Sequence, residues 1–339
     1  MSGSIRSMGV DLDFFLSRFG GVARRVCILA VVVVVSANLS SEAFGQRRHG
    51  PSPLDTLGDN PSQEDGWEVL RKFRTLGIAG DYSFRFQLKI MPRREKTTTV
   101  PGVLYGSMNE LGPVTRVDVA LSESTVDDHA NLVQAKVLRL LLQNGVFAKA
   151  YESEDDVNDG APQMIDSEQC FDPIAGSDFT VFDLLMPYIY WQRFVYEGRT
   201  TFRGRPTHVF WLYPPKEDEA LAAKMSGVRV FLDEEFYALI QAEIYDPKKE
   251  LAKTVTIVDF KKVADQWILN QVDVRDEATR DKTRFKVVDA NMNLDLPDKI
   301  FTLQALTTNV YGADISEVAA SMDSSEPTKS VSGSRTARP

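Results

Sequence analysis

The sequence predicts a mainly β protein of the α+β class, built on one large antiparallel sheet. In the second half of the chain, the last five apolar stretches of strand length, from 228 to 288, follow one another with polar turns and no helix between them. Such a series is typical of an antiparallel meander. In the first half, the stretch from Tyr82 to Ile90 carries apolar residues at every second position, which is the period of a half-buried strand.

The predicted strands lie on both sides of the chain's midpoint. In the strand at 116–121, Val117 and Val119 alternate with Arg116 and Asp118. Asn144-Gly145 stands between apolar runs and therefore predicts a hairpin, with strands at 135–142, which can also be interpreted as a helix, and at 146–148. The later strands are expected at 193–201, 206–213, 228–232, 236–245, 251–260, 267–274 and 282–288.

Three helices are predicted to accompany the sheet. Residues 64–76 place Trp67, Leu70 and Phe73 on one face, at helical spacing. Apolar residues on one face allow a helix to pack against a sheet. Shorter helices are expected at 179–185 and 216–225.

The N-terminal residues 1–45 are predicted to be a cleaved signal peptide. Arginines precede an apolar run from Val26 to Val35. This run is shorter than the roughly 20 residues that span a membrane, but it has the length of a signal-peptide core. Small residues follow at Ala43 and Gly45, so cleavage is expected after Gly45; an uncleaved anchor is the alternative. Because no cysteine follows the run closely, we expect an exported protein that is not lipidated.

Composition and charge limit the function classes. Residues 1–45 hold four basic and three acidic residues, so their removal changes the net charge from −9 to −10. This acidic balance argues against nucleic acid as a partner, because phosphates require clustered Lys and Arg. Cys170 is then the one remaining cysteine, which excludes an intrachain disulfide. We interpret it as a packed side chain, with a reactive thiol as the alternative.

The ends of the mature chain are predicted to lie outside the folded part. Residues 46–63 are rich in proline and charge and are expected to be a flexible lead-in. Residues 314–339 are rich in serine, threonine and charge and are expected to be disordered. One domain is therefore predicted over residues 64–313.

No residue pattern of a known catalytic or metal site stands out. The three histidines, His49, His129 and His208, have no second histidine at metal-ligand spacing. The sequence contains no Gly-x-Ser-x-Gly, phosphate-loop or dinucleotide motif. The acidic residues beside His129 and those at 152–159 are interpreted as solvated loops. We therefore expect neither an enzyme nor a cofactor or metal; a hydrolase with an unrecognised site is the outside alternative.

Several segments of the second half carry a recognisable order and spacing. They are Gly176-Ser177-Asp178-Phe179, Phe182 to Tyr188, Trp191, Gly204-Arg205, Tyr213-Pro214-Pro215, Val228 to Asp233, Tyr245-Asp246, Lys253, Trp267, Thr283 and Leu296 to Phe301. Together these segments resemble bacterial outer-membrane lipoprotein-sorting proteins of the broader LolA/LolB-like group. The resemblance is good over 170–301, but over 64–169 it rests on pattern alone. This chain is also longer than the known carrier.

The resemblance implies an incomplete, curved antiparallel β half-barrel with helices over its concave face. It further implies a periplasmic carrier or chaperone whose apolar cavity receives the acyl chains of lipoproteins or other lipids. Membrane-bound donor and acceptor proteins would be its partners, and the carrier is expected to be a monomer. An envelope structural or interaction module that carries no lipid is the alternative.

The candidate ligand-binding residues are apolar side chains that share one face of helix 64–76 or of the strands. The helix is expected to act as a lid that is held by apolar contacts and few hydrogen bonds. The strands would supply a continuous apolar wall, to which Val274 is also expected to belong. The candidates are Trp67, Leu70, Phe73, Phe84, Phe86, Leu88, Val117, Val119, Ile240, Ile244, Val255, Ile257, Ile268 and Val272.

Overall fold

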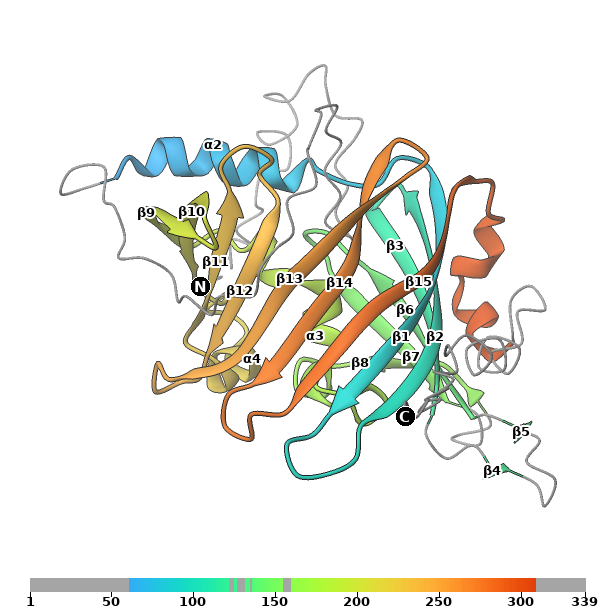
Figure 1. The fold of residues 1–339 in the computed structure, drawn as a ribbon. Helices are drawn as coiled ribbons and strands as arrows, with labels where there is room; N and C mark the ends of the chain where they lie inside the picture. The colour runs from blue at the N-terminus through green and yellow to red at the C-terminus, as the bar shows by residue number, and fades with distance from the viewer. Residues whose placement is uncertain (1–60, 122–124, 127–131, 135, 155–159, 309–339) are drawn as a thin grey trace, which may run out of the picture.

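A computed structural model describes residues 61–121, 125–126, 132–134, 136–154 and 160–308. These residues build a 13-stranded antiparallel sheet that curves strongly and stays open (Figure 1). The strand order is β8-β7-β6-β3-β2-β1-β15-β14-β13-β12-β11-β10-β9, so β8 and β9 form the two edges. The predicted incomplete half-barrel is confirmed. The predicted cleavage site and the 314–339 tail lie outside the described residues, as do His49 and His129.

The described elements are mostly strands, as the sequence predicts. The strands are β1 (Asp81–Met91), β2 (Thr98–Asn109), β3 (Gly112–Ala120), β4 (Thr125–Val126), β5 (Leu132–Gln134), β6 (Val137–Gln143), β7 (Lys149–Glu154), β8 (Gln163–Ile165), β9 (Phe194–Phe202), β10 (Arg205–Leu212), β11 (Gly227–Asp233), β12 (Leu239–Tyr245), β13 (Leu251–Val263), β14 (Gln266–Asp276) and β15 (Lys282–Leu294). The helices of the described residues are α2 (Gln63–Arg74), α3 (Val181–Leu185) and α4 (Glu219–Lys224), with 3₁₀ turns η2 (Gln169–Phe171), η3 (Ile174–Gly176), η4 (Pro187–Tyr190), η5 (Asp298–Phe301) and η6 (Leu303–Thr307).

The concave face of the sheet is filled by residues 173–191, which we call the inner segment. It comprises η3, α3 and η4, and Figure 1 shows α3 within the curve of the sheet. Period two in β1 buries Phe86 on this face, where its ring lies 4.8 Å from that of Phe285. Phe285 in turn lies 6.4 Å from Phe179 of the inner segment. Aromatic side chains therefore join the sheet to the segment that covers it.

Charged and polar side chains fix the inner segment to β13 and β15. Lys253 Nζ donates to the carboxylate of Asp183 at 2.9 Å and to the carbonyl oxygen of Asp178 at 3.0 Å. The Asp183 side chain is 1% exposed and also accepts a hydrogen bond from Thr180, which caps α3. Thr283 donates to the Asp178 carboxylate at 2.7 Å. Two strands of the sheet therefore hold one turn of the inner segment.

Helix α2 lies across the edge strand β9 and is held at both ends. The Gln63 side chain donates to the carbonyl oxygen of Tyr196 at 3.0 Å and accepts from its amide at 2.7 Å, as a neighbouring strand would. At the other end, Arg74 donates to the carbonyl oxygens of Ile189 and Trp191. The expectation of few hydrogen bonds is therefore wrong for this helix.

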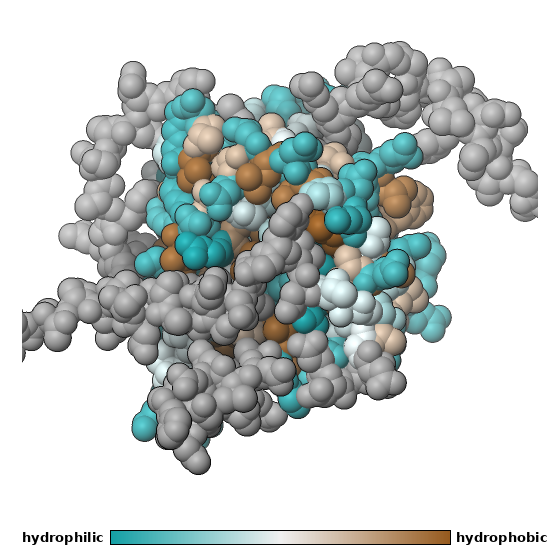
Figure 2. All heavy atoms as spheres, turned by 90° about the vertical axis from the view of Figure 1, so that its right-hand side faces the viewer, coloured by the Kyte–Doolittle hydropathy of each residue, from teal (hydrophilic) through white to brown (hydrophobic). Residues whose placement is uncertain are grey.

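The convex face carries a covering that the sequence pattern does not predict. Arg116 of β3 alternates with the apolar Val117, but it is also fully buried, because η5 and η6 pack over it. Its guanidinium pairs with Asp118 at 2.8 Å and donates to the carbonyl oxygens of Ala305 and Thr308. Figure 2 shows the molecule from the side on which η5 and η6 lie, with hydrophobic patches scattered among hydrophilic side chains.

The predicted hairpin at Asn144-Gly145 is present but wider than expected. Strands β6 and β7 pair in antiparallel register from Gln143↔Lys149 onward. Residues 144–148 form the loop, so the predicted strand at 146–148 is wrong. The side chains of Val146 and Phe147 point into solvent, and apolar residues there gave a misleading strand signal.

Candidate functional site

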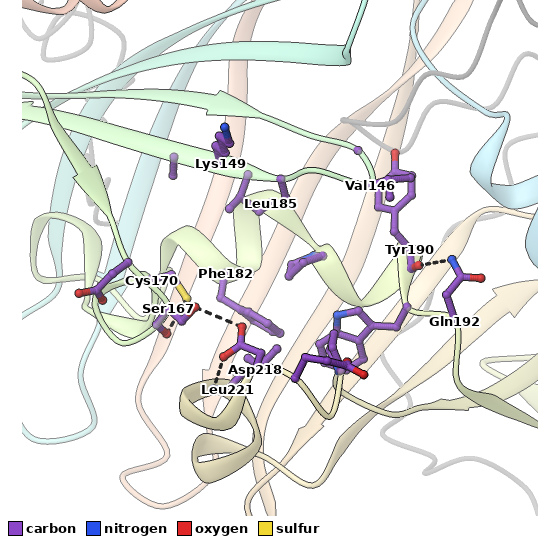
Figure 3. A pocket seen from close by; sticks show the side chains of 18 of the residues that line it. Val146, Lys149, Ser167, Cys170, Phe182, Leu185, Tyr190, Gln192, Asp218 and Leu221 are labelled. Carbon is purple, nitrogen blue, oxygen red and sulfur yellow. Dashed lines mark hydrogen bonds between the residues drawn. The ribbon is translucent and has the colours of Figure 1, made fainter. Parts of the chain in front are cut away.

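A pocket of about 650 Å³ opens where residues from both edges of the sheet approach one another. One side comes from the β6–β7 loop, β7 and β8, and the other from residues 213–221 next to β10. The inner segment supplies the floor. We call this site the edge pocket; Figure 3 shows side chains from all three parts around it.

The floor and one wall of the edge pocket are apolar and aromatic. Phe182 and Leu185 come from α3, and Trp191 follows η4. The rings of Phe182 and Trp191 lie 6.4 Å apart, so they support one another. Tyr213 and Leu221 line the wall on the β10 side. Apolar linings of this kind, in a concave site, favour ligands with hydrocarbon parts.

Polar groups gather at the rim of the edge pocket. The Ser167 hydroxyl, beyond β8, donates to the Asp218 carboxylate at 3.2 Å. Asp218 also accepts from the amide of Leu221 at 2.9 Å and so caps α4. The hydrogen bond between Ser167 and Asp218 links the two sides of the pocket; it is among the dashed lines in Figure 3. Lys149 and Arg193 are exposed at the rim.

Cys170 lies in the pocket wall as a protonated thiol. Burial, reinforced by nearby carboxylates of which Asp218 is the first, raises the pKa of Cys170 to about 12. Its sulfur donates to the carbonyl oxygen of Ser167 at 3.2 Å. Because the thiolate is the nucleophilic form, this cysteine is poorly suited to covalent chemistry at neutral pH. In the described ranges, no group of three or more His, Cys, Asp or Glu side chains is placed to hold a metal ion.

None of the candidate ligand-binding residues lines the edge pocket. The structure places most of them in the packed core beneath the inner segment. In the main core are Leu70, Phe73, Phe86, Leu88, Val117, Val119, Ile244, Val255, Ile257 and Val272, together with Val274. Phe84 and Ile268 lie in an adjoining cluster with Tyr82.

Two candidates do not share this face. Trp67 is 40% exposed, because it turns toward the edge strand, where its ring stacks 6.1 Å from that of Phe194. Ile240 packs with Phe231 in a separate cluster, while Ile244 belongs to the main core. A register shift between β11 and β12 occurs at this point. Such an irregularity reverses the facing of residues on its two sides.

Four residues of the pocket lining belong to sequence segments that were noted for another reason, the LolA-like resemblance. Phe182, Leu185, Trp191 and Tyr213 all belong to the segments that carry the LolA-like resemblance. Periodicity did not select them because they lie in short helices and turns. These four lining residues therefore lie in segments that the resemblance covers, and none of them was among the candidates chosen from periodicity.

Comparisons with known proteins agree with this fold. A family model described as "-like: Uncharacterized protein" matches residues 160–308, and no curated protein matches the chain. A DUF1329 family protein from Desulfovibrio piger has a similar structure, with a TM-score of 0.60 at 13% identity over 72% of this chain and 98% of its own.

Two further solved structures are similar. One, described as an outer membrane lipoprotein-sorting protein domain from Vibrio parahaemolyticus, gives a TM-score of 0.60 at 19% identity, over 73% of this chain and 100% of that one. The other, a LolA superfamily protein from Nitrosomonas europaea, gives a TM-score of 0.50 at 13% identity, over 70% of this chain and 96% of that one. The chain therefore has a LolA-like fold. In the described residues, no helix is long and apolar enough to cross a bilayer.

Proposed function

We propose that this protein is a periplasmic carrier or chaperone that holds the acyl chain of a lipoprotein or another lipid in the edge pocket. The observation that carries the proposal is an apolar, aromatic pocket between the two edges of an open LolA-like sheet. A similar structure is described as a lipoprotein-sorting domain. In the proposal, the N-terminal apolar segment directs export to the periplasm and is then cleaved.

The size and lining of the pocket suit a hydrocarbon ligand. Its volume of about 650 Å³ falls within the roughly 300–1,000 Å³ of small-molecule sites. Each methylene group that leaves water contributes about 0.8 kcal/mol to binding. Binding and release of an acyl chain need no covalent step. The apolar floor formed by Phe182, Leu185 and Trp191 is therefore sufficient for the proposed function.

The pocket is built so that its two sides can separate. Strand β8 has only three residues and pairs with β7 at the edge of the sheet. On the opposite side, α4 is a helix of six residues. The Ser167–Asp218 hydrogen bond joins these sides at the partly buried rim, where one such bond contributes about 1 kcal/mol. A ligand can therefore enter without breaking the packed core.

A fluorescent fatty-acid probe tests the proposal. We expect the purified protein to bind the probe with a Kd in the micromolar range, about −8 kcal/mol, and Ala148→Phe to weaken binding at least about tenfold by filling the pocket that Ala148 lines. Ala278→Phe, at an exposed turn position, is the matched control and should bind normally. Mass spectrometry of organic extracts should find lipid on protein recovered from the periplasm. Absence of both probe binding and lipid would favour the interaction module.

A further inference from the structure

Three large apolar side chains project from two adjacent loops of the sheet. Leu111, in the β2–β3 turn, is 70% exposed, and Val146 and Phe147, in the β6–β7 loop, are 69% and 79% exposed. Strand β3 pairs with β6, so these two loops lie side by side, and Gly145 lies against the carbonyl oxygen of Leu111. We call these three residues the apolar tip.

Hydrogen bonds brace the apolar tip from below. The side chain of Gln143 accepts from Asn109 at 2.7 Å and donates to the carbonyl oxygen of Pro113 at 3.1 Å, so it spans both loops. Asn144 is buried, and its side-chain amide donates to the carbonyl oxygen of Leu185 at 2.8 Å. The exposure of the apolar residues is thus fixed by the fold, because both loop bases are held in place.

The apolar tip adjoins the mouth of the edge pocket. Val146 belongs to both, since it lines the pocket and is exposed at the tip. The exposed charged side chains that line this pocket are three cations and two carboxylates, Lys149, Arg193, Lys216, Asp166 and Glu217, and Glu110 lies in the β2–β3 turn. Projecting apolar side chains match the acyl layer of a phospholipid surface, and the lysines and the arginine beside them can contact its phosphates.

We propose that the apolar tip docks this protein on a phospholipid bilayer by inserting Leu111, Val146 and Phe147 among the acyl chains. A projecting pair of loops needs no complementary cavity in its partner, which favours a lipid surface over a second protein. In the docked state the edge pocket opens toward the membrane. Docking is separate from the content of the pocket, because Leu111 and Phe147 do not line it.

Vesicle flotation tests the docking surface. The purified protein is mixed with vesicles of phosphatidylethanolamine and phosphatidylglycerol, and the floated fraction gives a partition coefficient. We expect the unchanged chain to float and Leu111→Ser/Phe147→Ser to partition at least about tenfold less, since two large apolar groups no longer enter the bilayer. The control is Leu251→Ser, which alters a leucine that is 37% exposed at the opposite end of the strands; it should float like the unchanged chain.

The outcomes separate docking from the carrier proposal. Circular dichroism and thermal unfolding establish that each variant folds, and the fatty-acid probe should bind the double variant as it binds the unchanged chain. The docking proposal is overturned if the unchanged chain does not float or if the double variant floats equally well. It is also overturned if sedimentation shows a dimer that depends on the tip while flotation is absent. Loss of probe binding with flotation retained counts only against the carrier proposal.

Discussion

The two sides of the inner segment differ in how completely they are packed. On the side of β1, β13 and β15, aromatic rings are in contact and Lys253 holds the buried Asp183. On the side of β7 and α4, the same segment borders the edge pocket. The comparison shows how one segment can be both part of the packed core and the floor of a pocket.

The largest effect is expected where a buried charge would lose its partner. Lys253→Met leaves the Asp183 carboxylate buried without its cation, so the free energy of unfolding should fall by about 3 kcal/mol or more, as measured by urea denaturation. Lys262 pairs with Asp265 at an exposed turn, and Lys262→Met should change stability little. Equal effects of the two substitutions would show that the inner segment is not anchored by this pair.

An intermediate effect is expected from extra volume on the packed side. A Cβ added at Gly102 of β2 would overlap the ring of Phe86 on the neighbouring strand. Overpacking of a core costs about 1–3 kcal/mol, so Gly102→Ala should lower the urea midpoint accordingly. An unchanged midpoint would mean that the concave side has spare room near Phe86 and that the contrast between the two sides is weaker than described.

The smallest effect on stability is expected from extra volume on the pocket side. Ala148→Phe adds a ring where the wall faces open space, so the free energy of unfolding should change by less than about 1 kcal/mol. Urea denaturation of this variant beside Gly102→Ala compares the two sides directly. A loss larger than that of Gly102→Ala would indicate that the edge pocket is filled in solution.

Local periodicity was sufficient to predict the elements in which apolar residues recur without interruption. The alternation in β1 and the helical spacing of α2 both gave the correct element, and α2 begins at Gln63, one residue before the prediction. Strand β2 was not predicted because Gly102 and Gly106 interrupt its pattern. In the sheet these glycines face the rings of Phe86 and Tyr82, which leave no space for a side chain. Their role is visible only once the strand pair is known.

Facing and covering were harder to predict than the elements themselves. Alternation places Arg116 and Val117 on different faces of β3. Nothing nearby in the sequence shows that η5 and η6, from the end of the described chain, will bury Arg116. Trp67 has helical spacing with Leu70, yet the neighbouring edge strand decides that it is partly exposed. In both cases the deciding contact is distant in sequence.

The pairing of the first strand with the last has a consequence for the order of folding. Strand β1 lies between β2 and β15, and Tyr82 stands opposite Met292. Until β15 has emerged, β1 is an edge strand with unpaired backbone groups and an aromatic face, the kind of edge that invites wrong pairing. Contacts so distant in sequence also slow folding. The sheet can therefore be completed only when nearly the whole chain is available, so the polypeptide stays incompletely folded while it is being synthesised.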